Sequence, residues 1–159
     1  MAVDMFLKLA GIAGESQDAQ HKGEIDILGW SWGVAEAQPA AGAGVAAPKP
    51  NFHQLSVQKV VDLSSAPLLA TVAKGSRIAT GTLTIVRTGA APETFLVLNM
   101  KDIAIASINM AESQAENRPT ETIALVFGQI DFEYTEFLAN GAKGATDSFK
   151  WNIATNQAL

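Results

Sequence analysis

The chain has 159 residues, of which 48% are hydrophobic and only 17% are charged, and it contains no cysteine. This length predicts a single domain over residues 1–159, and the apolar content excludes a disordered chain. The formal charge of −5 argues against nucleic acid as a partner. Without cysteine, thiol catalysis and thiolate metal sites are excluded as well.

The N-terminal segment predicts neither a signal peptide nor a membrane anchor. It has no basic start, and Asp4 and Lys8 interrupt its apolar residues. No stretch approaches the roughly 18 consecutive apolar residues of a membrane helix, so we expect no membrane insertion. We expect a protein that is made in the cytoplasm and that, if it is secreted, leaves without a cleavable signal.

Alternating apolar and polar residues predict strands along much of the chain. Residues 3–9 form a first strand, and residues 24–37 form a second one with apolar side chains on both faces, as in a sheet covered on both sides. We expect residues 102–110 to follow the preceding strand through a kink, and Gly128 to mark a bulge at which a strand over 120–136 exchanges its faces. The other expected strands are 53–61, 78–87, 93–101 and 148–153.

Residues 65–74 predict one short helix. A serine stands at its start, Pro67 lies in its first turn, Lys74 faces its C-terminal end, and Gly75 ends it. Because a helix of three turns is not stable alone, its apolar side chains are expected to pack against the sheet. These side chains are Leu68, Leu69 and Val72.

The count of strands and helices indicates the class of fold. About eight strands and one helix predict a mainly β protein, built either as a barrel or as a sandwich. No segment repeats at a fixed period, so a solenoid is not expected.

The longest loop, residues 38–51, is rich in alanine, proline and glycine. Its prolines exclude regular strand pairing over its length. Loops this long within a domain are usually functional, or disordered until they bind. Two interpretations stay open: a surface excursion without a role, or a loop that reaches a neighbouring molecule.

No set of residues predicts an active site, a metal site or a cofactor site. Neither His21 nor His53 has further metal ligands or a nucleophile at a suitable spacing. The glycines at positions 42 and 44 lack the third glycine and the flanking strand and helix of a dinucleotide site. We therefore expect no enzyme, no cofactor and no bound metal.

Two patterns keep other functions open. Carboxylates at alternate strand positions could serve a hydrolase, although they are more typical of the solvent-facing side of a sheet. They are Glu24, Asp26, Asp131 and Glu133. Trp30 and Trp32 could stack on a sugar in a monomeric carbohydrate-binding barrel, although tryptophans lie more often in cores or interfaces.

The surplus of apolar residues favours self-assembly. Several expected strands are apolar on both faces, although the domain is too small for a sheet that is covered on both sides throughout. The remaining apolar face is therefore expected to be a contact between molecules. Identical chains that meet head to tail close into a ring where the rotation permits. The residues thus favour a structural protein that assembles with copies of itself.

Four segments are similar to the haemolysin-coregulated protein (Hcp) family, the inner-tube subunit of type VI secretion systems. They are residues 2–8, 14–16, 25–33 and 151–153, with the sequences Ala-Val-Asp-Met-Phe-Leu-Lys, Gly-Glu-Ser, Ile-Asp-Ile-Leu-Gly-Trp-Ser-Trp-Gly and Trp-Asn-Ile. The helix that follows Val-Asp-Leu-Ser-Ser and the strand that begins at Thr120 also fall where that family has them. The resemblance covers nearly the whole chain in order.

This resemblance implies a compact β-barrel of about eight strands with one short flanking α-helix. It further implies that six copies close into a ring and that rings stack into a hollow tube. A contractile sheath would drive this tube, tipped by a spike protein, into a target cell, and small effector proteins would travel in its lumen. The tail-tube protein of a phage-like particle shares this architecture and is kept as an alternative.

The resemblance also implies two sites. Ser31 falls where the family places a lumen-facing residue that contacts cargo. The loop 38–51 falls where the family has an extended loop that contacts the neighbouring ring, although here it is rich in alanine and proline rather than glycine. No enzymatic extension follows the barrel, so a fused toxin is not expected. The residues expected to take part in ring stacking are Gln38, Gly42, Gly44, Lys49 and Asn51.

Overall fold

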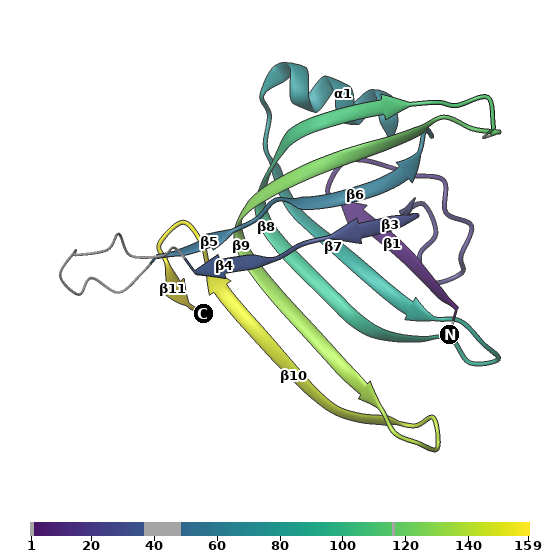
Figure 1. Ribbon diagram of the computed structural model, residues 1–159, viewed down its shortest axis with the longest axis vertical. Coiled ribbons are helices and arrows are strands. Elements are labelled where there is room, and N and C mark those ends of the chain that lie inside the picture. Colours follow the sequence, from purple (N-terminus) through teal and green to yellow (C-terminus); the bar gives the residue numbers. More distant parts are fainter. Residues whose placement is uncertain (1, 37–48, 116) are drawn as a thin grey trace.

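The computed structural model describes residues 2–36, 49–115 and 117–159 (Figure 1). Eleven strands and one helix lie in these residues. Their order is β1 (Val3–Leu9), β2 (Ile25–Asp26), β3 (Gly29–Ser31), β4 (Val34–Glu36), β5 (Pro50–Phe52), β6 (Leu55–Val60), α1 (Ser65–Lys74), β7 (Ile78–Arg87), β8 (Glu93–Ala111), β9 (Thr120–Phe137), β10 (Lys143–Asn152) and β11 (Gln157–Ala158).

Nine of these strands form one antiparallel sheet that curls around the core (Figure 1). The order along it is β11-β10-β9-β8-β7-β1-β2, and β6 pairs with the first half of β9 and with β3. The strand ladder does not close into a ring within the described residues. Instead, the Ile27 N–H donates to the Met5 carbonyl (2.9 Å) and the Leu28 N–H donates to the Gln58 carbonyl (2.7 Å), which links β1 to β6. The mainly β fold with one helix is confirmed, but the strands are not closed into a barrel by pairing; these two hydrogen bonds link β1 to β6 across the gap.

The kink expected before residue 102 is confirmed. Asp102 has a positive φ of 56°, and β8 runs through it without interruption. On β8 the buried residues are even-numbered up to Met100 and odd-numbered from Ile103 onward, so the strand exchanges its faces at Asp102. On β9 the same exchange occurs at the same level, between Phe127 and Ile130. The pairing of the two strands keeps its register across this level, so the bulge expected at Gly128 is wrong, although the exchange of faces is correct.

The segment expected as one strand over 24–37 is divided into the three short strands β2, β3 and β4. Each pairs with a different strand: β2 with β1, β3 with β6, and β4 with β5. The expected strands over 93–101 and 102–110 are the single strand β8, and the last expected strand begins earlier, at Lys143.

The helix α1 has the expected bounds. Gly75 adopts a left-handed φ of 63° and caps its C-terminus, while the Asp62 carboxylate accepts a hydrogen bond from the Ser64 N–H (2.9 Å) before its first turn. Leu68 is fully buried, but Leu69 and Val72 are exposed, so the expectation that all three pack against the sheet is wrong.

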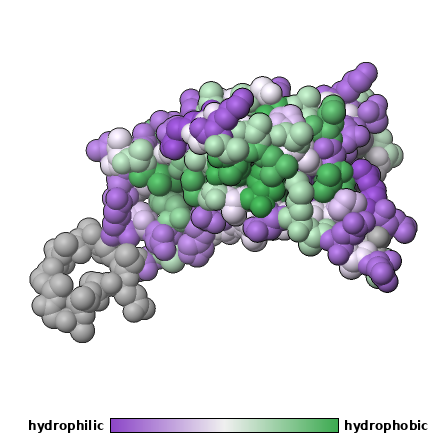
Figure 2. All heavy atoms as spheres, turned by 90° about the horizontal axis from the view of Figure 1, so that it is seen from above, coloured by the Kyte–Doolittle hydropathy of each residue, from purple (hydrophilic) through white to green (hydrophobic). Residues whose placement is uncertain are grey.

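The helix contributes to an apolar surface at its end of the molecule. Figure 2 looks down on this end and shows hydrophobic side chains in a band across its middle. Exposed large apolar side chains near or on α1 include Leu63, Leu69 and Val72. A short helix that buries one residue fully and exposes two others is suited to contact with another molecule.

In the described part of the chain, no helix has the length and apolar character needed to cross a membrane.

Candidate functional site

The face of the sheet that carries Ser31 is polar and uncharged. Ser31 on β3 pairs with Ser56 on β6, and two residues further along Gly29 pairs with Gln58. Gln58 in turn pairs with Thr122 on β9, which continues the same row. A shallow depression is lined by Gly29, Trp30, Ser31, Ser56, Gln58 and Thr122.

Alternation along the strands separates this polar face from the core. The row between these residues contains Trp30, Val57 and Ile123, and it points to the other side. Val57 and Ile123 are fully buried, and Trp30 packs against the core cluster. Ser31 is therefore exposed on a polar surface, and the apolar core lies directly behind it.

The loop residues are placed only in part. Lys49 is exposed, and Asn51 is exposed on β5, where it pairs with Ala35 of β4. Gln38, Gly42 and Gly44 lie outside the described residues. The described residues on either side of this gap thus belong to, or directly adjoin, the ribbon of β4 and β5.

The two histidines have structural contacts. The His21 ring stacks on Phe6 at a centroid distance of 4.3 Å, and its Nδ1 lies 2.9 Å from the Glu24 carboxylate. The His53 side chain is exposed and lies next to Gly33. Among the described residues, no three histidine, cysteine, aspartate or glutamate side chains come together in a way that could hold a metal ion.

The carboxylate and tryptophan candidates do not form a cleft either. Asp131 lies 3.6 Å from the Lys150 ammonium, which is a cross-strand ion pair on the outside of β9 and β10. Trp30 and Trp32 are half-buried and pack against the core, and Trp32 also contacts Phe52 and Phe127. The tryptophans therefore do not stand together as an open platform for a sugar.

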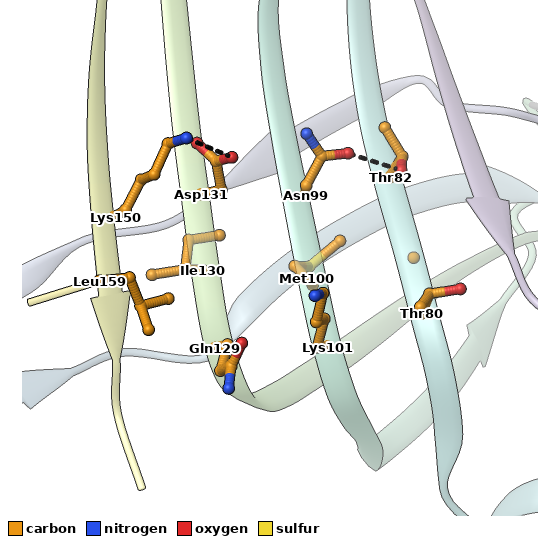
Figure 3. A pocket seen from close by; sticks show the side chains of 11 residues that line it. Thr80, Thr82, Asn99, Met100, Lys101, Gln129, Ile130, Asp131, Lys150 and Leu159 are labelled. Carbon is orange, nitrogen blue, oxygen red and sulfur yellow. Dashed lines mark hydrogen bonds and ion pairs between the residues drawn. The ribbon is translucent and has the colours of Figure 1, made fainter. Parts of the chain in front are cut away.

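A second depression lies on the outer side of β7, β8, β9 and β10 (Figure 3). Four of its polar side chains bind one another in pairs: the Thr82 hydroxyl donates to the Asn99 amide oxygen (2.9 Å), and Lys150 contacts Asp131. Leu159 at the end of the chain forms part of the same wall. These contacts join neighbouring strands, so these four side chains stabilise the sheet.

One buried charged cluster was not found from the sequence. Lys59 on β6 is fully buried, and its ammonium contacts the Glu121 carboxylate of β9, the Asp62 carboxylate (2.9 Å) and the Ser65 hydroxyl of α1 (3.3 Å). The Ser65 hydroxyl donates to Glu121 (2.8 Å). The cluster joins the start of α1 to two strands. The sequence did contain an indication of this cluster. Lys59 lies two residues from the buried Val57, and Glu121 lies two residues from the buried Ile123, so each charged side chain is on the buried face of its strand.

At the kink, an exposed ion pair joins the end of the helix region to β8. Arg77 donates to both carboxylate oxygens of Asp102, at 2.7 and 3.2 Å. This hydrogen bond from Arg77 holds the pKa of the Asp102 carboxyl below its usual value, and the bond to Asp102 raises the pKa of Arg77.

Comparison with known proteins decides the family. Residues 6–134, most of the chain, match a family model described as "Type VI secretion system effector, Hcp". The chain belongs to the Hcp family. The Pseudomonas aeruginosa protein named "Protein hcp1" is 36% identical to it over 159 residues, which are 98% of each chain.

Solved Hcp structures agree with the fold. A crystal structure of Hcp1 from Salmonella typhimurium covers 100% of both chains with a TM-score of 0.82 and 29% identity. A type VI secretion system effector from Yersinia pestis covers 94% of this chain and 99% of its own, with a TM-score of 0.74 and 30% identity. A structure described as a type six secretion system protein has a TM-score of 0.90 and 26% identity, and it covers 99% of this chain and all of its own. The resemblance stated from the sequence is therefore confirmed.

Proposed function

We propose that this Hcp chain is a structural subunit of the type VI secretion inner tube and not an enzyme. Six copies close into a ring, the rings stack into a hollow tube, and small effector proteins travel in the lumen. The tube is exported with the spike protein when the sheath contracts. The chain is made in the cytoplasm and leaves the cell through the type VI secretion system.

The observation that carries this proposal is family membership over the full length of the chain, with 36% identity to an Hcp1 protein. Two features of the molecule support it. Large apolar side chains remain exposed on several elements, among them Leu28, Leu69, Val72 and Phe149, which favours contact between copies. The polar face around Ser31 suits a wall that must hold different proteins weakly, because it presents hydroxyl and amide groups and no charge.

Native mass spectrometry tests the ring. We expect a hexamer at micromolar concentration, and electron microscopy should show rings with a central hole. A stable monomer under these conditions would refute the proposal.

The lumen position of Ser31 is tested separately by Ser31→Gln. Ser31 is exposed on a surface of small side chains, so a longer side chain can be added there without disturbing the core. We expect rings to form normally and to retain less of the small proteins that wild-type rings carry from the native host, as quantified by mass spectrometry. Ser113→Gln, at an exposed serine in the turn between β8 and β9, is the matched control. Unchanged retention, or loss of the hexamer, would contradict the assignment of Ser31.

A further inference from the structure

The surface around Ser31 extends over four strands and carries no charge. β3, β6, the first part of β9 and the second part of β8 lie next to one another in that order (Figure 1). In residues 29–31, 55–60, 104–111 and 120–127, the only charged side chains are Lys59 and Glu121, and both are buried on the core side. We call the outward side of these strands the charge-free face. Its central residues are Gly29, Ser31, Ser56, Gln58, Ser107, Asn109, Thr122 and Ala124.

The outward surface of the other half of the sheet is charged. Lys101, Asp131, Glu133 and Lys150 lie there on β8, β9 and β10, and none of them is buried. About a quarter to a third of an ordinary protein surface consists of charged residues of both signs. A surface across four strands without any charge is therefore unusual, and it indicates a contact with a particular kind of chemistry.

Two carboxamides are the long polar side chains of the charge-free face. Gln58 and Asn109 are both exposed, and both pair with Thr122, one from each side. Two spacings between strands separate their backbones by roughly 10 Å, which is the length of about three residues of extended chain. Like a peptide group, each carboxamide can both donate and accept hydrogen bonds. The pair is therefore arranged to bind the peptide groups of an extended segment that lies across Thr122.

The absence of charge also determines what the face rejects. A charged side chain that is brought against it loses hydrating water and finds no opposite charge in return. An uncharged segment loses less, because hydroxyl and amide groups of the face replace the hydrogen bonds that it made to water. The face is thus expected to discriminate by charge rather than by sequence.

We propose that the charge-free face binds extended, uncharged segments of the proteins that travel in the lumen, and that Gln58 and Asn109 are its specificity-determining residues. This inference rests on the proposed function, because it names the kind of segment that the wall of the lumen holds. It concerns side chains on β6 and β8 and the chemistry of their partner, so it can fail while the ring and the tube stand.

Fluorescence anisotropy with purified rings tests the proposal. The probes are three labelled peptides of equal length with blocked ends: one of serine, threonine, asparagine and glycine only, and two in which every second residue is glutamate or lysine. We expect the neutral peptide to bind about tenfold more tightly than either charged one. Its affinity should not change with salt concentration, because no ion pair contributes to it.

The variants Gln58→Ala and Asn109→Ala test the two carboxamides. Because a hydrogen bond contributes about a two- to tenfold factor to an equilibrium, each variant should bind the neutral peptide weaker by that factor. Asn99→Ala is the matched control, since Asn99 is likewise an exposed asparagine of β8 but lies on the charged half of the sheet. It should bind the neutral peptide like the wild type.

Gln58→Glu separates specificity from general damage to the fold. The new side chain has almost the same shape but adds a negative charge to the face. We expect it to bind the lysine peptide more tightly than the wild type does, and to lose this gain at high salt. A variant that fails to fold cannot gain binding in this way.

Native mass spectrometry of every variant distinguishes the two proposals. If rings form but bind the neutral peptide no better than the charged ones, or not at all, this inference is wrong while the tube proposal stands. If Gln58→Ala or Asn109→Ala binds like the wild type, or if either loses the hexamer, the two residues do not determine specificity. If the wild type itself remains monomeric, the proposed function fails first.

Discussion

Replacing Lys59 by methionine tests how the fold holds its helix. Lys59 is fully buried beneath the start of α1, where its ammonium contacts two carboxylates, those of Glu121 and Asp62, and the Ser65 hydroxyl. Glu121 is 1% exposed as a residue and its side chain is fully buried. Methionine fills a similar volume but leaves these two carboxylates close together without a positive charge.

The magnitude follows from burial. Removing one partner of a buried ion pair costs about 3–5 kcal/mol, because the remaining charge cannot be solvated. A domain of this kind is stable by about 5–15 kcal/mol in total, so Lys59→Met should remove a large share of the stability. Replacing Glu121 as well, in Lys59→Met/Glu121→Leu, removes the stranded charge and should recover part of the loss. Asp62 keeps its hydrogen bond from the Ser64 N–H in both variants.

Urea unfolding followed by tryptophan fluorescence measures these differences. All variants must be compared at one protein concentration, because assembly adds to the apparent stability. Lys150→Met is the control: its ammonium lies 3.6 Å from Asp131, but it is 49% exposed, so its loss should cost less than about 1 kcal/mol. If Lys59→Met costs no more than Lys150→Met, the buried cluster does not hold the helix and the reasoning is refuted.

Two further predictions concern the backbone and one concerns pH. A Cβ at residue 14 would lie 2.3 Å from the Glu24 carbonyl oxygen, so Gly14→Ala should destabilise the fold by about 1–3 kcal/mol or more in urea, whereas Gly29→Ala, with open space around it, should not. Because Asp102 has a φ of 56°, Asp102→Val should melt several degrees below Asp102→Asn, which tolerates that conformation; equal melting temperatures would contradict this. The lowered pKa of Asp102 means that its bond to Arg77 stabilises the fold above the usual aspartate pKa and loses this effect as the pH falls through the lowered value. The urea midpoints of Arg77→Gln and the wild type should therefore differ slightly at pH 7 and converge in strong acid, and a difference that grows in acid would refute the assignment.

The strands and the helix were predictable because they follow from local rules. The bounds of α1 could be predicted from Pro67 in its first turn and Gly75 at its end. Gly75 takes the left-handed conformation that ends the helix. Alternation in β9 also showed that the buried face must change near Gly128. The reason for that change was not local: Asp102, on the neighbouring strand, takes a positive φ at the same level, and both strands bend together in register.

The parts that could not be predicted depend on contacts between distant segments. Leu69 and Val72 were expected on the sheet because a short helix needs packing, but α1 is held instead by Leu68 and by the buried charges of Lys59 and Glu121. The pairing of those two charges requires β6 to lie beside β9, which the sequence alone does not specify. Once β6 is known to lie beside β9, Lys59 and Glu121 are both on the buried face of the sheet. They are then expected to form an ion pair, because burying either charge without a partner would cost too much free energy.

The segment from Ile25 to Glu36 shows why so much of the candidate function lies in a short stretch. Its first part links β1 to β6 through the hydrogen bonds of residues 27 and 28. Because those bonds fix β3 against β6, they also fix Ser31 on the polar face. Trp32 then turns inward to contact Phe52, and the chain continues directly into the ribbon. A change at residues 27 and 28 should therefore disturb both the proposed lumen face and the β4–β5 ribbon that follows it along the chain.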